Sequence, residues 1–436
     1  MRINKLVEAG ASSRPTSLDL RSWLFFASVQ TGVTICIPVF ALGTELGRHA
    51  ALATLVPGIL LGGLIVAILA SLTGYAGYRQ RGPTAMIVRG TFGSTGGKLV
   101  TVLLIVSSFG WFSVQLEMLV KNFNEFLAVL AVAPVSRIGA TLLAGAVMST
   151  TAIVGYRALG RVAYVAVPLL LIVVGVPLWT GLQGRDLTEL TLRPADGPAY
   201  SFGLIVSIVS GTYITGTTLC PDLTRFLRTR KDVVAGAFFS LACAYPLLLS
   251  LSAALGVVYG SNSIIEVMHR AGFMVPALVV LSLATWTSND KNVYEAALAL
   301  SVLVPGVARW KLTTIAAALG ILWAMVGVYD HFVVALLFLG ICVAPLAGVY
   351  VTDFLLDERR YQDPDPPPAF RWRPFVAWGA GIAIGSTTLS AAAGGLGLWT
   401  LTNVPTLDAL LGAALTQLML TRWEAAGAVS RRDATS

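Results

Sequence analysis

The sequence predicts an all-α, polytopic membrane protein with twelve transmembrane helices. Of its 436 residues, 56% are apolar and only 12% are charged, whereas about a quarter of the residues in a soluble protein are charged. Uncharged apolar runs recur along the chain at the length of about 20 residues that a spanning helix needs. A transmembrane barrel would show segments of about ten residues with alternating polarity, so we expect helices.

Twelve candidate spans follow one another, and we expect the first to stay in the chain rather than be cleaved as a signal peptide. They cover residues 22–46, 51–78, 97–123, 139–156, 160–182, 200–228, 233–259, 272–303, 312–328, 332–356, 374–396 and 404–421. The predicted organisation is a tail (1–21), two five-span units (22–182 and 200–356), a linker (357–373), two further spans (374–421) and a second tail (422–436).

The charge pattern predicts the orientation of the chain. Far more of the 30 Lys and Arg residues lie in loops on the side of the N-terminus than in loops on the opposite side. Since short cytoplasmic loops are enriched in basic residues, we expect both termini in the cytoplasm and the protein in the cell membrane. The net charge of +8 then reflects orientation in the lipid bilayer, and no nucleic-acid partner is predicted.

The chain carries no pattern typical of an enzyme. The four cysteines lie in or near spans without paired spacing, and they are predicted to be buried residues without a disulfide or a metal. The three histidines fall in loops, and no Cys/His cluster or phosphate-binding loop is present. We therefore expect no catalytic residues, no cofactor and no ATP-driven pump.

Two spans contain residues that disfavour a continuous helix at membrane depth. The first span holds Gly32 and Pro38, which predict a helix that stops and restarts; a simple proline kink is the alternative. The sixth span holds Ser210–Thr218, a run of small, polar and β-branched residues for which we predict a second interruption. Interrupted spans at corresponding places in two halves indicate an inverted-repeat secondary transporter with its site near the midplane.

The third span offers a candidate binding surface. Trp111 and Gln115 are four residues apart, so they lie on one face of a helix. A flat aromatic surface beside an amide that donates and accepts suits a planar heterocycle with N–H and C=O edges. The alternative is that Trp111 packs in the core and Gln115 bonds a neighbouring helix.

The eighth span offers a candidate cation site. Ala284, Thr287 and Ser288 could supply three oxygens, and carbonyls freed at Gly32 and Ile35 would bring the number to five. Such a set suits Na⁺ as a coupling ion bound without a carboxylate. The alternative is that the hydroxyls bond carbonyls of their own helix.

Several stretches together resemble the nucleobase:cation symporter-1 family. They are Gly32–Pro38, Thr84–Gly93, Gly110–Phe112, Thr212–Phe226 and Trp286–Tyr294. The resemblance runs over nearly the whole chain. It implies a leucine-transporter fold, in which the two five-span units are inverted repeats and the last two helices are additional.

The resemblance also implies a set of site residues. A planar substrate would lie between Trp111 and Tyr213. Further substrate contacts would come from Gln115, Thr212, Thr215 and Asn289, and from the backbone near Cys36 and Ile37. The implied sodium ligands are Gly32, Ile35, Ala284, Thr287 and Ser288, the set reached above from the oxygen count.

The chain departs from the family pattern at three positions. Ser108, which we include among the substrate contacts, stands where the cytosine permeases of the family carry a glutamine. The aromatic residue of the sixth span is a tyrosine, Tyr213, and Lys291 replaces a neutral residue. The substrate therefore stays open among cytosine, allantoin, hydantoins, purines, uracil and a pyrimidine vitamin precursor.

The expected activity is inward symport of one heterocycle with one Na⁺ by alternating access. Proton coupling is the alternative for the ion, because Glu117, Asp290 and Glu295 lie near or within spans. The other interpretation of these carboxylates is a salt-bridge or helix-packing role, with Lys291 as a possible partner. A membrane sensor that binds heterocycles without moving them is a further alternative.

Overall fold

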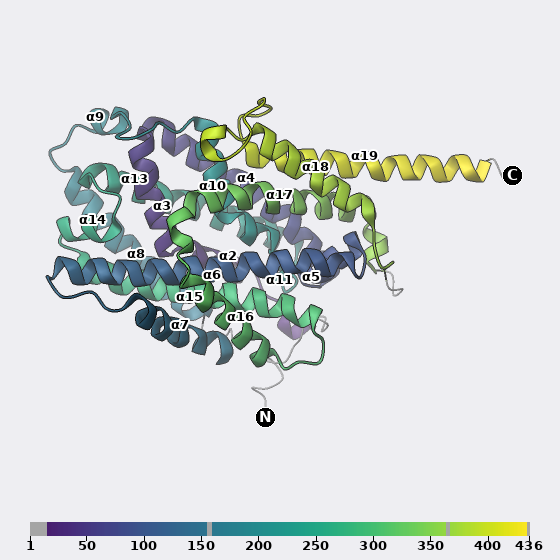
Figure 1. Cartoon of the computed structure of the whole chain (residues 1–436), viewed down its shortest axis with the longest axis horizontal. Helices are drawn as coiled ribbons and strands as arrows, with labels where there is room; N and C mark the ends of the chain where they lie inside the picture. Colours follow the sequence, from purple (N-terminus) through teal and green to yellow (C-terminus); the bar gives the residue numbers. More distant parts are fainter. Residues whose placement is uncertain (1–14, 155–158, 363–366, 434–436) are drawn as a thin grey trace.

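The computed structural model describes residues 15–154, 159–362 and 367–433, and its secondary-structure elements in these ranges are helices joined by loops (Figure 1). The first half contains η1 (Ser17–Asp19), α2 (Trp23–Thr34), α3 (Ile37–His49), α4 (Leu52–Gln80), α5 (Thr84–Phe92), α6 (Gly96–Val129), α7 (Arg137–Val154), α8 (Leu159–Leu182), α9 (Leu187–Leu192), α10 (Phe202–Thr218) and α11 (Pro221–Thr224). The second half contains α12 (Arg230–Ala237), the π-helical turn η3 (Phe238–Ala244), α13 (Tyr245–Tyr259), α14 (Ile264–Arg270), α15 (Met274–Leu303), α16 (Arg309–Ala324), η4 (Val328–His331), α17 (Phe332–Leu356), η5 (Glu358–Gln362), α18 (Trp372–Thr388), η6 (Ala391–Ala393) and α19 (Pro405–Asp433). The predicted all-α class is confirmed.

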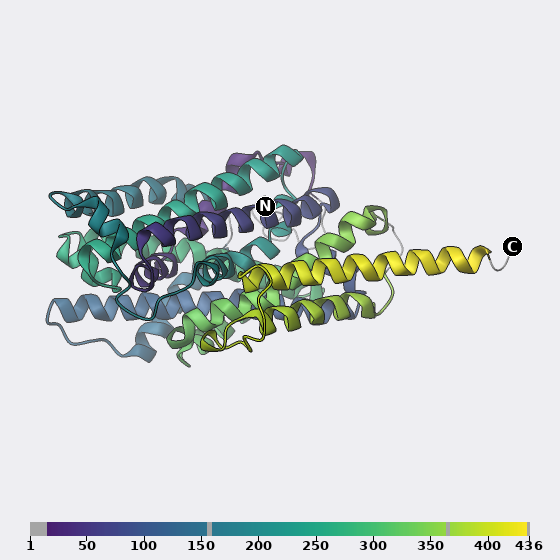
Figure 2. The ribbon, with the colours of Figure 1, turned by 90° about the horizontal axis from the view of Figure 1, so that it is seen from above.

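The long helices run roughly along the long axis of the molecule, and α19 extends beyond the others to the C-terminus (Figure 1). Viewed from above, α18 and α19 lie side by side along one edge (Figure 2). Both pack close to α17: the indole N–H of Trp378 donates to the Cys342 carbonyl at 2.8 Å, and a Cβ at Gly348 would lie 2.6 Å from the Leu410 carbonyl oxygen. The two additional helices are therefore docked on the core.

Membrane-spanning character is shown by length and composition for part of the described chain. Four helical segments are long and apolar enough to cross a bilayer, namely Leu52–Gln80, Gly96–Val129, Arg230–Tyr259 and Phe332–Leu356. The bent pair α2 and α3 gives a fifth crossing if it counts as one span. Shorter apolar helices cover Arg137–Ile153, Pro168–Leu182 and Phe202–Thr218. The number of twelve spans stays a prediction.

Most helix bounds follow the predicted spans. α6 runs to Val129, past the predicted end at residue 123, α10 ends at Thr218, before the predicted end at residue 228, and two further differences concern α18 and α19. α17 covers the predicted range, whereas α18 ends at Thr388, where Leu389 turns to an extended conformation with φ −67° and ψ 132°. α19 continues to Asp433, beyond the predicted end at residue 421. Parts of the predicted tails (1–14 and 434–436), span end (155–156) and linker (363–366) lie outside the described residues.

The short helix α5 connects several segments at one end of the bundle. The backbone N–H of Thr84 donates to Asp222 Oδ1 at 2.7 Å, and the Thr91 hydroxyl lies 2.8 Å from the hydroxyl of Tyr361 in η5. The N–H of Arg371 donates to the Phe92 carbonyl at 3.0 Å. α5 is therefore hydrogen-bonded to α11, to η5 and to the start of α18.

Candidate functional site

The first predicted interruption is present. α2 ends at Thr34, α3 begins at Ile37, and the two axes differ by 59°. Cys36 between them is extended, with φ −144° and ψ 160°. Pro38 accounts for the break, because it has no N–H to donate to the Thr34 carbonyl and its ring would clash with that group.

α15 binds the backbone on both sides of this break. The hydroxyl of Thr285 accepts a hydrogen bond from the Ile37 N–H at 3.0 Å. One turn further along, the hydroxyl of Ser288 donates to the Val33 carbonyl at 3.2 Å. Thr285 was not among the predicted site residues, although its three-residue spacing from Ser288 places both on one helix face.

The second interruption was predicted in the wrong place, because α10 is continuous through Ser210–Thr218. Four of its hydroxyls bond carbonyls of their own helix at 2.8 Å: Ser210 to Val206, Thr212 to Ile208, Thr217 to Ile214 and Thr218 to Ile214. Gly211 serves packing, since a Cβ there would lie 2.6 Å from the Leu336 carbonyl oxygen of α17. The helix ends at Thr218, just before Pro221 begins α11.

A cavity lies where α2, α3, α6, α10 and α15 meet. About 40 Å³ of it is open to water-sized molecules. It is lined by Val33, Cys36, Val39, Trp111, Gln115, Thr212, Tyr213, Thr215, Gly216, Lys291, Asn292 and Glu295. Six of the nine predicted substrate-binding residues are therefore in one cavity, although their roles stay predictions.

The other three predicted substrate contacts do not line the cavity. Ser108 is buried elsewhere along α6. The Asn289 amide donates to the Phe112 carbonyl at 3.2 Å and accepts from the Asn292 amide at 3.2 Å. The N–H of Ile37 is engaged by Thr285. Asn292, three residues further along α15 than Asn289, lines the cavity instead.

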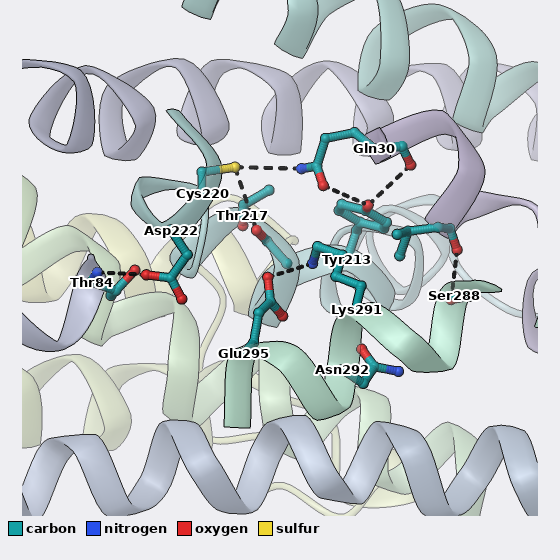
Figure 3. Close-up of polar contacts among 12 residues, drawn as sticks. Gln30, Thr84, Tyr213, Thr217, Cys220, Asp222, Ser288, Lys291, Asn292 and Glu295 are labelled. Atoms are coloured by element: carbon teal, nitrogen blue, oxygen red, sulfur yellow. Dashed lines mark hydrogen bonds and ion pairs between the residues drawn. The ribbon is translucent and has the colours of Figure 1, made fainter. Parts of the chain in front are cut away.

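Tyr213 has a partner that the sequence did not predict. Its hydroxyl lies 3.3 Å from the carbonyl oxygen and 3.4 Å from the Oε1 atom of Gln30 on α2 (Figure 3). The Gln30 amide in turn donates to Cys220 Sγ at 3.5 Å. Gln30 thus connects Tyr213 in the wall of the cavity to Cys220, which lies between α10 and α11.

Two neutral polar atoms of the cavity wall have no hydrogen-bond partner. Gln115 donates from Nε2 to the Ser288 hydroxyl at 3.1 Å, while its Oε1 atom has no partner. The hydroxyl of Thr215 is also without a partner. Both side chains are buried. A buried polar atom that is left unpaired costs free energy, so these atoms favour a ligand that bonds them.

The predicted sodium ligands lie at the contact between α2 and α15. Ser288 reaches across to α2 through the Val33 carbonyl. Thr287 bonds the Ala284 carbonyl of its own helix at 2.8 Å, as the alternative interpretation expected. Gly32 lies near the end of α2 and Ile35 follows it. The assignment of these five residues to a cation stays a prediction.

An ion pair that sequence reasoning did not assign to the site lies in the cavity wall. Lys291 Nζ is 2.6 Å from Glu295 Oε1, and both side chains are 2% exposed. Figure 3 shows the ammonium directed at the carboxylate, close to Tyr213. The sequence suggested Lys291 as a possible salt-bridge partner of the carboxylates considered for proton coupling, and the spacing of four residues favours Glu295, but it did not place the pair at the cavity.

The other two acidic residues considered for a proton lie away from the cavity. Glu117 forms an ion pair with Arg137 at 2.6 Å and accepts from the Tyr329 N–H at 2.9 Å. Asp290 accepts from the Thr151 hydroxyl at 2.7 Å. Of the three carboxylates, Glu295 is the one that lines the cavity.

Comparison with known proteins identifies relatives with this architecture. Residues 15–405 match a family described as permeases for cytosine/purines, uracil, thiamine and allantoin. The chain is similar to the cytosine permease of Escherichia coli (strain K12), with 29% identity over 91% of this chain and 87% of that protein. It is 24% identical to the hydantoin permease of Microbacterium maritypicum, over 80% of this chain and 76% of that protein.

Solved structures show the same fold. Mhp1, a nucleobase-cation-symport-1 family transporter in a closed conformation with bromovinylhydantoin bound, aligns with a TM-score of 0.75 at 18% identity, over 95% of this chain and 94% of that one. A Na⁺-coupled sialic acid symporter aligns with a TM-score of 0.67 at 9% identity, over 95% and 94%. The protein has a leucine-transporter-like fold, and it belongs to the nucleobase:cation symporter-1 family of permeases, which are transporters rather than enzymes.

Proposed function

We propose that this permease is a Na⁺-coupled symporter that carries a planar nitrogen heterocycle into the cell by alternating access. The cavity beside the break in α2 and α3 supports this proposal above all. Two aromatic residues from different helices, Trp111 and Tyr213, line it together with the unpaired acceptor of Gln115. A flat ring with an N–H group satisfies both features, through stacking and through a hydrogen bond to the amide oxygen.

The proposed sodium site consists of Gly32, Ile35, Ala284, Thr287 and Ser288. The contact of Ser288 with Val33 supports it, because a cation there would join α2 to α15. Gln115 donates to the same Ser288 hydroxyl, which puts a proposed substrate contact next to a proposed ion ligand. By linkage, ion and substrate would then raise each other's affinity by the same factor. We place both termini in the cytoplasm, as the loop charges predict.

The first test measures binding by purified full-length protein. Thermal shift against cytosine, uracil, hypoxanthine, allantoin and hydantoin is recorded with and without Na⁺. We expect at least one ring to raise the melting temperature, and to do so more strongly with Na⁺. Trp111→Ala should weaken the binding of that ring by about 10- to 100-fold, since stacking on an aromatic side chain contributes about 1–3 kcal/mol.

Trp323→Ala is the matched control, because Trp323 packs on Phe109 of α6 and does not line the cavity. It should leave the ring's affinity unchanged. A protein that bound none of the rings, or that bound them equally well after Trp111→Ala, would contradict the proposal.

Proton coupling is the second candidate, and the position of Glu295 in the cavity wall favours it. Uptake into proteoliposomes separates the two ions. For a sodium symporter, replacing Na⁺ with choline at fixed pH abolishes accumulation. For a proton symporter, accumulation survives the replacement and follows the pH gradient. Counterflow of radiolabelled ring tests transport itself, since a sensor would accumulate nothing.

A further inference from the structure

The ion pair of Lys291 and Glu295 is buried, where a charged side chain has a high desolvation free energy. Both side chains are 2% exposed, and both line the cavity. Removing two charges from water costs several kcal/mol per ion, and replacing a buried pair by apolar residues of similar volume is often neutral or stabilising. Stability of the fold therefore gives no sufficient reason for a Lys–Glu pair at this position.

The pair has unused hydrogen-bonding capacity. An ammonium group has three donors, and a carboxylate accepts through two oxygens. Among the contacts of the described residues, Glu295 is the partner of Lys291, which leaves two of its donors at the cavity wall. Asp222, the acidic residue of neighbouring α11, is engaged by the Thr84 N–H at 2.7 Å (Figure 3).

Other walls of the same cavity carry the neutral polar atoms described above. Gln115 Oε1 on α6 and the Thr215 hydroxyl on α10 are buried without partners. A ligand in this cavity thus meets a charged donor beside a charged acceptor on α15, and neutral groups on α6 and α10. This arrangement suits a small ring with polar atoms on more than one edge.

We propose that Lys291 and Glu295 bind the substrate ring directly and select rings that carry a C=O group next to an N–H group. This inference rests on the proposed function. Lys291 donates to the ring carbonyl, and Glu295 accepts from the neighbouring ring N–H. Because Nζ and Oε1 are 2.6 Å apart, two adjacent polar atoms of a planar ring can bond both while the ion pair persists.

Neutral rings with a lactam edge, such as uracil, hypoxanthine and hydantoin, are the substrate class that this geometry fits. A ring that carries a carboxylate would place two anionic groups on one ammonium, and it is disfavoured. Charge-assisted hydrogen bonds are stronger than neutral ones, so the pair contributes affinity as well as selection.

The test separates substrate binding from a structural role by using both single variants and the double variant. Lys291→Met and Glu295→Leu each leave one buried charge unpaired, so each lowers the melting temperature. Lys291→Met/Glu295→Leu removes both charges and recovers most of the melting temperature. In the double variant we expect the dissociation constants for uracil, hypoxanthine and hydantoin, measured by calorimetry, to rise at least tenfold. A double variant with recovered stability and wild-type affinity overturns the proposal.

Two controls sharpen this result. The double variant Glu117→Gln/Arg137→Gln removes an ion pair outside the cavity and should leave ring affinity unchanged. 1,3-Dimethyluracil keeps both carbonyls and lacks N–H groups. It should bind wild-type protein at least tenfold more weakly than uracil, and this penalty should shrink in the Lys291→Met/Glu295→Leu variant; an equal penalty in both proteins overturns the proposal. A wild-type protein that bound no ring would instead show that the proposed function had failed.

Discussion

The interruption between α2 and α3 and the one between α10 and α11 differ in what completes their backbone hydrogen bonds. At the first, side chains of α15 bond the Ile37 N–H and the Val33 carbonyl, next to the cavity. At the second, the Thr217 carbonyl accepts from the Thr73 hydroxyl at 2.7 Å and the Thr218 carbonyl from the Tyr350 hydroxyl at 2.8 Å. These donors belong to α4 and α17, whose residues are absent from the cavity lining.

Both interruptions coincide with a proline. Pro38 lies in the first turn of α3, and Pro221 begins α11. Glycine and β-branched residues without a proline, as in Ser210–Thr218, remain helical. Proline alone does not break a span, because Pro57 and Pro345 lie inside the continuous helices α4 and α17. The comparison teaches that the neighbouring helices decide whether the groups freed at a break face the cavity or the packed core.

The largest expected effect comes from removing the proline at the first break. Pro38→Ala restores an N–H for the Thr34 carbonyl and removes a bias of about 3 kcal/mol against a continuous helix, a factor of about 100 in equilibrium. We expect the initial rate of uracil uptake into proteoliposomes to fall by a comparable factor. Pro221→Ala is the matched variant and should change uptake only a few-fold. Equal losses in the two variants would show that the breaks are equivalent.

The second effect concerns the hydroxyl that joins α15 to α2. Ser288→Ala removes a proposed ligand of the cation, and a hydrogen bond or ligand contact to a charged group contributes about 1.5–3 kcal/mol. We expect the Na⁺ concentration for half-maximal uptake to rise by about 10- to 100-fold. Ser301→Ala is the control, because that hydroxyl of α15 bonds its own helix at the Leu298 carbonyl. Unchanged sodium stimulation in Ser288→Ala would mean that the cation site is assigned wrongly.

A smaller effect is expected from removing the hydroxyls that hydrogen-bond the backbone groups at each interruption. Thr285→Val and Thr73→Val each leave a buried backbone group unpaired, at a cost of about 1–3 kcal/mol. Both variants should lower the melting temperature. We expect Thr285→Val to reduce ring affinity as well, because the Ile37 N–H lies beside the cavity, whereas Thr73→Val should keep wild-type affinity. The same affinity loss in both would contradict the distinction between the two breaks.

The smallest effect is expected for Glu117→Gln. Its ion pair with Arg137, which is half exposed, lies outside the cavity, and ion pairs with an exposed partner contribute little to stability. We expect wild-type uptake and an unchanged dependence of uptake on pH. A loss of pH dependence in this variant would restore Glu117 as a candidate for proton coupling.

The sequence predicted what depends on local spacing. Pro38 located the first break, and the four-residue spacing of Trp111 and Gln115 put both at one cavity. Contacts between distant segments could not be predicted: Gln30 meets Tyr213 across 183 positions of the chain. The error at Ser210–Thr218 has a similar origin, because close packing against the Leu336 carbonyl explains Gly211 and is visible only in three dimensions.

The size of the cavity has a consequence for the kinetics of binding. Its 40 Å³ hold roughly three water molecules, whereas a cavity that accommodates an aromatic ring measures roughly 150 Å³. The helices around it must separate before a ring can occupy it. At high ligand concentration the observed association rate should therefore level off at the rate of that separation, as expected when a conformational change precedes binding.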